Sequence, residues 1–400
     1  MVSFDLISAI VFYSLLFILI IVKRDKLQFQ KMFFPLLYVF LYKGNFGLKF
    51  MEKAAQKLRK FWRVYGVLAI ITGYIGMIII IVLLVAITIR AIVSDAAQVS
   101  LVIPGIPIPS APIHIPFWFG MIALVVGVIV HEYSHGILAR AYDVKVKSSG
   151  FGIFALFIPL IPLAFVEPDE KKLIKKDRKA QISMYAAGTF SNFVVAVISF
   201  LLLLFVIAPF VSGNFDFAFD IGVVNATGPV ALTGLTEGFR LHEINNVPIT
   251  NVTDFTSVTE NLKPGDNVLL NTDKGEYNVK LGEHPENSSK GYFGIHDIRL
   301  EPIKTKERLG NLGFIAWIAF WLGGVLEWMV NLNLALGLFN LLPLGPVDGG
   351  RMFYTGVSKF LPDGIVRKIM TYLGIVLGIM LIINFYFLFR GIGLFFFSFF

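Results

Sequence analysis

Long apolar runs alternate with short polar segments along most of the chain. Several runs reach about 20 residues, which is the length a helix needs to cross roughly 30 Å of bilayer hydrocarbon. The runs predict six membrane-spanning helices, at residues 4–22, 65–92, 117–141, 184–211, 313–342 and 369–389. The pattern therefore predicts an α-helical polytopic membrane protein.

The composition agrees with this class. The chain is 56% hydrophobic and only 16% charged, and its mean hydropathy is +0.74, whereas soluble chains are about a quarter charged. The net charge of +8 does not indicate nucleic-acid binding, because the basic residues gather in short loops beside the apolar runs. The chain has no cysteine, so disulfides are excluded and any zinc must be bound by nitrogen and oxygen atoms.

The distribution of Lys and Arg predicts which side of the membrane each loop faces. Basic loops are expected in the cytoplasm, and they lie at residues 23–63, 140–147, 171–179 and 351–368. The proline-rich loop 94–116 has no Lys or Arg, so we expect it outside, together with both chain ends. Residues 32–41 are apolar but too short to cross, and two interpretations stay open: an amphipathic segment on the cytoplasmic surface, or an ordinary solvated basic loop.

Residues 149–168 are very apolar but are interrupted by Pro159 and Pro162, and both flanks are basic. A full span would place one flank on the wrong side of the membrane. Irregular backbone at membrane depth is tolerated where it is buried in protein or lines a cavity. We therefore expect a re-entrant β-hairpin over 149–168. Its unpaired strand edges would hold an extended substrate by strand addition. Replacing residues 154–157 with proline should then abolish cleavage and leave zinc bound.

Residues 212–308 differ from the rest of the chain in being polar, with short strand-like runs between turns at 263–266 and 273–275. The three Asn-X-Ser/Thr sequons of the chain, at Asn225, Asn251 and Asn287, lie within this segment. We expect a small β-rich domain outside the membrane. The predicted organisation is a membrane domain in two parts, residues 1–211 and 309–400, with this β-rich domain inserted between them.

His131, Glu132 and His135 form an H-E-x-x-H motif at the end of the third apolar run. Two histidines four residues apart lie on one face of a helix and can bind one divalent cation. A glutamate beside the first histidine can take a proton from metal-bound water. The alternative is a pair of buried, hydrogen-bonded histidines, but three polar side chains in hydrocarbon are costly without a metal.

Asp348 is the conspicuous candidate for a third ligand. It follows the fifth apolar run and is framed by two prolines before it, at 343 and 346, and two glycines after it, at 349 and 350. Prolines end a helix and glycines allow sharp turns and close approach, so Asp348 is expected at a bend near the depth of His131. Taken alone, Asp348 is equally well interpreted as a turn-capping carboxylate.

Residues 131–136, together with 340–343 and Asp348-Gly349, resemble the site-2 protease family of intramembrane zinc metalloproteases. Residues 188–192 are similar to the G-x-x-x-N element of that family, and 154–167 to its membrane-associated β-hairpin. Residues 221–295 resemble a PDZ domain, although Gly238-Phe239 stands where such a domain usually has Gly-Asp.

The resemblance implies zinc as the cofactor, with His131, His135 and Asp348 as its ligands and Glu132 as the general base. It also implies that Asn192 and Asn340 hold the substrate backbone or stabilise the developing oxyanion. From the residues alone, each asparagine could instead form a helix–helix hydrogen bond.

The expected function is hydrolysis of peptide bonds in or near the membrane segments of single-span or anchored proteins. The active site is expected toward the cytoplasmic side, and the PDZ-like domain outside would select substrates. One alternative is an inactive scaffold that binds peptides, although a scaffold has no need for Glu132. Another is a zinc peptidase with an E-x-x-x-D ligand, but Glu327 is followed at the fourth position by Asn331. A transporter is disfavoured because no inverted repeat is visible.

Overall fold

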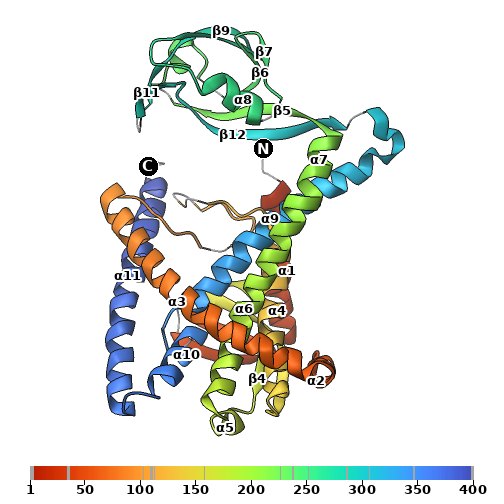
Figure 1. The fold of residues 1–400 in the computed structure, drawn as a ribbon, viewed down its shortest axis with the longest axis vertical. Helices are drawn as coiled ribbons and strands as arrows, with labels where there is room; N and C mark the ends of the chain where they lie inside the picture. The colour runs from red at the N-terminus through yellow and green to blue at the C-terminus, as the bar shows by residue number, and fades with distance from the viewer. Residues whose placement is uncertain are drawn as a thin grey trace. The chain divides into compact units, whose positions relative to one another are not determined.

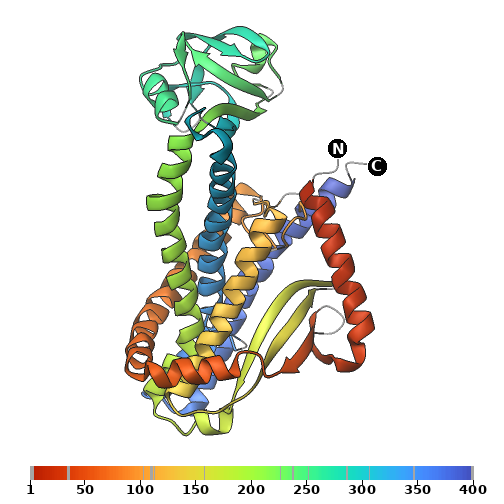
Figure 2. The same ribbon diagram turned by 90° about the vertical axis from the view of Figure 1, so that its right-hand side faces the viewer.

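The computed structural model describes residues 4–33, 37–101, 103–108, 111, 113–156, 158–225, 227–236, 238–250, 252–284, 287–305, 307–345 and 347–397. Phe157 and Asn251, which the predictions above include, lie outside these residues. The chain divides into two compact units. A helical unit comprises Met1–Leu203 and Gly323–Phe400, and a β-rich unit comprises Leu204–Leu322 (Figures 1 and 2).

Long apolar helices dominate the described chain. They are α1 (Phe4–Lys23), α3 (Arg59–Ser94), α4 (Phe117–Ala141), α6 (Arg178–Leu202), α9 (Gly313–Asn340) and α11 (Asp363–Phe397). As predicted, the described residues contain six helices that are long and apolar enough to cross a membrane. α3 begins six residues before the predicted span, because Arg59, Lys60 and Arg63 favour helix and extend its polar end.

Shorter helical segments complete the helical unit. They are η1 (Arg24–Lys26), α2 (Leu48–Lys57), α5 (Glu170–Leu173) and α10 (Asp348–Val357). α2 is amphipathic: it buries Met51 and Ala55 against α4 and exposes lysines on the other side. A Cβ on Gly136 of α4 would overlap Met51, so the glycine lets α2 pack closely against the helix that carries the H-E-x-x-H motif.

The fourth predicted span continues into a π-helical turn (Leu203–Ile207) and then α7 (Ala208–Asn214). Pro209 stands at the start of α7. Because proline lacks the N–H that would bond the preceding turn, a local change of helical pitch is expected there.

A four-stranded antiparallel sheet lies beside α4, in the order β1 (Gln28–Phe33), β2 (Leu37–Gly44), β3 (Val146–Leu156) and β4 (Ile158–Pro168). Within residues 32–41, positions 32–33 and 37–41 are strand, so the interpretation as a solvated loop is wrong there. A location on the cytoplasmic surface stays a prediction, and residues 34–36 lie outside the described residues. Strand pairing satisfies the backbone groups of an apolar segment, and it buries Val39 and Leu41.

The strands predicted at 149–168 are present as the antiparallel pair β3 and β4, while their entry into the membrane stays a prediction. β2 pairs with the second side of β3, from Leu37↔Leu156 to Gly44↔Ser149. Gly152 permits this approach, because a Cβ there would stand 2.6 Å from the carbonyl oxygen of Phe40. Residues 154–156 of β3 are thus paired on both sides, and β1 and β4 are the edges of the described sheet.

The β-rich unit is built on a sheet of order β12-β5-β6-β8-β9, with β7 paired to β6 and a separate pair β10–β11. The strands are β5 (Phe215–Val224), β6 (Phe239–Ile244), β7 (Val247–Pro248), β8 (Asn267–Thr272), β9 (Gly275–Lys280), β10 (Gly282–His284), β11 (Asn287–Tyr292) and β12 (Ile295–Thr305). The remaining elements are η3 (Ala231–Thr233), α8 (Val252–Thr259) and η4 (Glu307–Leu312). The core includes Phe219, Ile244 and Leu270, and the PDZ identity of this unit stays a prediction.

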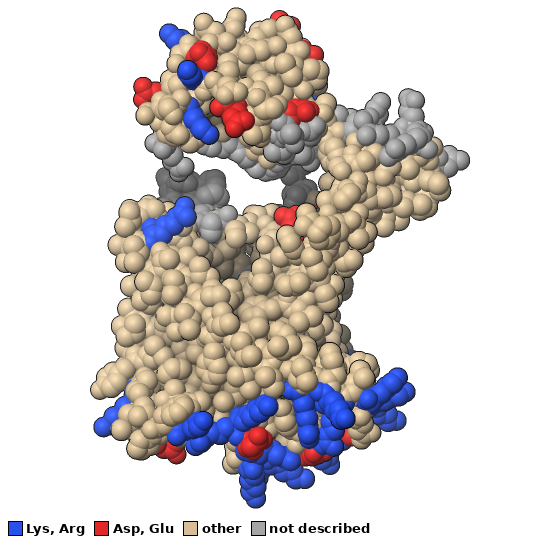
Figure 3. Space-filling model, viewed as in Figure 1, with Lys and Arg blue, Asp and Glu red and all other residues tan. Residues whose placement is uncertain are grey.

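Charge is distributed unevenly over the helical unit. In the view of Figure 3, Lys and Arg gather at the end that carries α2, α5 and α10, and uncharged residues cover most of the remaining visible surface of this unit. α2 contributes Lys49, Lys53 and Lys57 to this basic end, and α5 contributes Lys171 and Lys172. The pattern is typical of a membrane protein with one basic interfacial end.

Candidate metal centre

Two histidines of α4 and the first residue of α10 converge inside the helical unit. The Nε2 atoms of His131 and His135 each lie 3.1 Å from Oδ2 of Asp348. One potential ligand atom from each of the three side chains lies within 4.8 Å of the others. Both imidazoles are buried. The structure thus brings together the three residues predicted as metal ligands, from positions more than 200 residues apart.

The segment between α9 and α10 folds tightly to present Asp348. A Cβ on Gly349 would lie 2.6 Å from the carbonyl oxygen of Leu342, and one on Gly350 would overlap the carbonyl of Leu344. Only glycine leaves room for the backbone to double back at these two positions. The sequence signal of Asp348 followed by two glycines therefore has a direct steric cause.

Gly188 of α6 lies against both histidines of the centre. A Cβ at this position would lie 2.6 Å from Cδ2 of His131 and would overlap Nε2 of His135. α6 therefore packs directly against both imidazoles, next to their Nε2 atoms. The G-x-x-x-N pattern pointed to Gly188, but its role as the surface against which the histidines rest follows from the structure.

A backbone carbonyl sets the orientation of His135. Its Nδ1 donates to the carbonyl oxygen of Met184 at 2.7 Å, which places a proton on Nδ1 and turns Nε2 toward Asp348. Nδ1 of His131 is buried without a hydrogen-bond partner in the described part of the chain. Backbone groups such as the Met184 carbonyl carry no side-chain signature, so the sequence could not indicate this contact.

The donor set fits zinc. Two imidazole nitrogens and one carboxylate oxygen provide the three protein ligands that catalytic zinc sites use, with a fourth position open. Burial raises the pKa of Asp348, but the neighbouring His135 charge and hydrogen bonds from both imidazoles outweigh it and hold that pKa below its usual range. Asp348 is therefore anionic at neutral pH, as a zinc ligand requires.

Glu132 is half-buried between α4 and the sheet. Its Oε2 accepts a hydrogen bond from the backbone N–H of Val166 at 3.0 Å. Since Val166 lies on β4, the edge strand holds the carboxylate of the predicted general base. This link between strand and base was not foreseen from the sequence.

Asn192 and Asn340 lie on helices that flank the centre but are not part of the three-residue cluster. Asn192 is fully buried; in the amide orientation that satisfies its partners, Nδ2 donates to Gly188 O at 3.0 Å and to Gly127 O at 3.3 Å. Nδ2 of Asn340 donates to Leu336 O of its own helix at 3.0 Å. Asn192 thus bridges α6 and α4, one helical turn from the histidines.

Asn333 of α9 is a buried polar residue that the sequence analysis did not single out. Its Nδ2 donates to Met329 O at 2.8 Å, while its buried Oδ1 has no hydrogen-bond partner among the described residues. That oxygen faces Gly127, where a Cβ would lie 2.9 Å away. Because Asn192 reaches the same glycine, the two amides meet on α4 one turn before His131.

This combination of an H-E-x-x-H helix, a distant aspartate and six candidate spans defines a site of the membrane-peptidase class. The sequence model of peptidase family M50 matches residues 119–381. The chain belongs to this family, the site-2 protease family of the resemblance described above.

Two relatives illustrate the similarity. An uncharacterised protein of Methanocaldococcus jannaschii is 28% identical over 325 residues, which cover 77% of this chain and 76% of that protein. A protein of Enterococcus faecalis named "Probable protease eep" is 28% identical over 204 residues, 42% of this chain and 47% of that protein. The first similarity extends over most of both chains, and the second over about half of the named protease.

Proposed function

We propose that this protein is an intramembrane zinc metalloprotease that hydrolyses peptide bonds in or near the membrane segments of anchored proteins. The observation that carries the proposal is the convergence of His131, His135 and Asp348 beside Glu132. Membership of a peptidase family supports it. An inactive scaffold is not favoured, because it would have no use for a complete ligand set with an oriented glutamate.

His131, His135 and Asp348 would hold the zinc ion through Nε2, Nε2 and a carboxylate oxygen. Bound zinc supplies Lewis-acid activation, which lowers the pKa of a coordinated water to about 7. The Nδ1 bond from His135 to Met184 keeps that imidazole in the orientation that binding needs. The burial of both imidazoles limits their contact with bulk water.

Glu132 would act as the general base. The Val166 N–H fixes Oε2, so the second carboxylate oxygen is the one that accepts a proton from the attacking water. Glu132 would then pass this proton to the leaving amine, which requires a carboxylate within hydrogen-bond reach of both. Its position on the same helix as the two histidine ligands keeps the base and the metal site in one rigid frame.

Asn192 and Asn340 are proposed to hold the substrate backbone or to stabilise the developing oxyanion. In this structure both Nδ2 groups donate to helix carbonyls. Contact with substrate would therefore require each amide to exchange a helix carbonyl for a substrate carbonyl. Helix carbonyls keep their own backbone hydrogen bonds, so this exchange leaves no strong acceptor unsatisfied.

The substrate is proposed to bind β4 as an added strand. A helical substrate must unwind before its peptide bond becomes accessible, and an edge strand offers partners for the freed backbone groups. β4, rather than residues 154–156 of β3, is the edge next to α4, because β2 covers the other side of β3. The contact from Val166 to Glu132 places this edge against the general base.

The proposed substrates are membrane proteins with a single span or another membrane anchor. The basic end of the helical unit supports a cytoplasmic location for the end that carries α2, α5 and α10. The β-rich unit is proposed to lie outside the membrane as a PDZ-like domain that selects which substrates enter.

Metal content and cleavage of a reporter membrane protein test this function together. The native chain should contain about one zinc per chain, and His135→Ala or Asp348→Ala should lose most of it, because each removes one of three ligands. Glu132→Gln should keep zinc but lower kcat by roughly a hundredfold or more, the usual effect of removing a general base. Full cleavage by Glu132→Gln would refute the assigned base, and undiminished zinc in both ligand variants would refute the site.

A further inference from the structure

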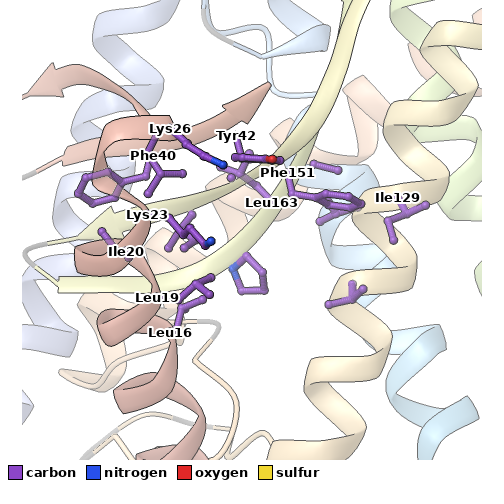
Figure 4. Close-up of a pocket in the computed structure, with 17 residues that line it drawn as sticks. Leu16, Leu19, Ile20, Lys23, Lys26, Phe40, Tyr42, Ile129, Phe151 and Leu163 are labelled. Carbon is purple, nitrogen blue, oxygen red and sulfur yellow. The ribbon is translucent and has the colours of Figure 1, made fainter. Parts of the chain in front are cut away.

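An apolar chamber of about 390 Å³ lies between α1, one face of the four-stranded sheet and α4. Figure 4 shows Leu16, Leu19 and Ile20 of α1 on one side and Ile129 of α4 on the other. Residues of β2, β3 and β4 form the back of the chamber. Because α1 and α4 are both candidate membrane spans, the chamber lies within the membrane part of the protein.

α1 has little protein packed against it. Of its 20 residues, Ala9 and Ile20 are the buried ones, so most of this helix faces its surroundings rather than the protein. The chamber lies between the sheet and the C-terminal part of α1, from Leu16 to Lys23. An apolar space of this volume is in the range of ligand-binding cavities, 300–1,000 Å³.

Two lysines mark one end of the chamber. Lys23 ends α1, Lys26 ends η1, and both line the chamber. Figure 4 shows both amines directed into the space between α1 and the strands, with that of Lys26 near Tyr42. Their position at the end of a membrane span is the depth at which lysine side chains reach lipid headgroups. The chamber therefore combines an apolar interior with a cationic mouth.

The chamber does not suit an added substrate strand. It covers a face across three strands, whereas strand addition requires an edge. Lys23 and Lys26, which both line the chamber, favour an anionic occupant.

We propose that this chamber binds one anionic membrane lipid. Its phosphate would lie between Lys23 and Lys26, and one hydrocarbon chain would fill the space lined by Leu16, Phe40 and Phe151. Such a lipid fills the gap between α1 and the sheet and so holds α1 in place. It also covers the face of α4 at Ile129, one helical turn before Glu132.

Lipid retention tests the proposal without relying on proteolysis. The full chain is purified in a non-ionic detergent, exchanged into equal parts phosphatidylglycerol and phosphatidylcholine, and examined by native mass spectrometry. The native protein should retain about one phosphatidylglycerol. Excess inorganic phosphate should not displace it, because the protein binds the hydrocarbon chain of the lipid as well as its headgroup. Lys23→Gln/Lys26→Gln should reduce the preference for the anionic lipid by roughly 30-fold.

Matched variants separate the chamber from general basic charge and from helix stability. Leu16→Trp fills the chamber and should abolish retention, whereas Leu15→Trp, on an exposed position of the same helix, should not. Lys49→Gln/Lys53→Gln on α2, outside the chamber, should retain lipid as the native chain does. The proposal would be overturned if the native protein retained no lipid. It would also be overturned if lipid retention were unchanged in both Leu16→Trp and Lys23→Gln/Lys26→Gln. A loss of reporter cleavage in Leu16→Trp with lipid retention intact would overturn it too, and would indicate a substrate segment instead.

Discussion

Gly188 shows how a single absent side chain can determine a metal site. The two imidazoles rest on α6 at the place where every other residue would project a Cβ between them. The ligands themselves are visible in the sequence because their chemistry is unusual for a membrane helix. The G-x-x-x-N pattern marks Gly188 among the 36 glycines of the chain, but a glycine has no side-chain chemistry that would show its contact with the histidines.

Gly188→Ala should therefore displace His131 and His135 and lower the zinc content well below one per chain, together with reporter cleavage. Overpacking of this kind costs typically 1–3 kcal/mol. Gly374→Ala on α11 is the matched control, because a Cβ there meets nothing within 4 Å and alanine favours helix. Zinc analysis and thermal unfolding would check both variants; full zinc occupancy in Gly188→Ala would contradict the packing described here.

At the scale of elements, the long helices and the ligand spacing were predictable because both are local. Apolarity over about 20 residues and histidines four apart need no knowledge of the rest of the fold. The pairing of β2 with β3 was not predictable, since Tyr42 meets Phe151 from more than 100 residues away. The resulting choice of edge strand, and the Val166 N–H that holds Glu132, depend on that pairing.

The prolines of β4 are consistent with its place at the edge. The ladder alternates, so Pro162, Ala164 and Val166 direct their backbone groups away from β3, as the bond from Val166 to Glu132 shows. Proline is tolerated in sheets where its missing N–H would face outward. Of these three residues, Pro162 has no N–H and Val166 already donates to Glu132, which leaves the N–H of Ala164 for a substrate.

Ala164→Pro should consequently abolish strand addition and reduce reporter cleavage at least tenfold, while zinc content stays near one per chain. Ala164→Ser keeps the N–H and should cleave at close to the native rate. Leu163→Pro, whose N–H faces β3, should instead disrupt the sheet. Kinetics and zinc analysis on the three variants separate these effects; native cleavage by Ala164→Pro would exclude β4 as the substrate-binding edge.

At the scale of the whole molecule, the two compact units have separate hydrophobic cores. The core that contains Phe219 and Ile244 belongs entirely to the β-rich unit, and the core around Leu138 and Ala186 belongs to the helical unit. The metal ligands lie in the helical unit alone. The site should therefore form regardless of whether the β-rich unit is folded.

Ile244→Ala tests this independence. Ile244 is fully buried, so its truncation should cost about 2–5 kcal/mol and make the β-rich unit sensitive to limited proteolysis. Zinc content should remain near one per chain. A parallel loss of zinc would show that the two units fold as one, and Val247→Ala, at an exposed position three residues away, should change neither measurement.

The outward-facing N–H of Ala164 has a consequence for the pattern of cleavage products. If substrate pairs with Ala164 through both of its outward backbone groups and keeps the same side-chain face toward α4, its register can change only in steps of two residues, because a one-residue shift turns the other face toward α4. Neighbouring registers then differ by two residues, which is about 6–7 Å of extended chain. A substrate cut at more than one bond should yield fragments whose ends are spaced in steps of two residues, a parity that mass spectrometry of the products would reveal.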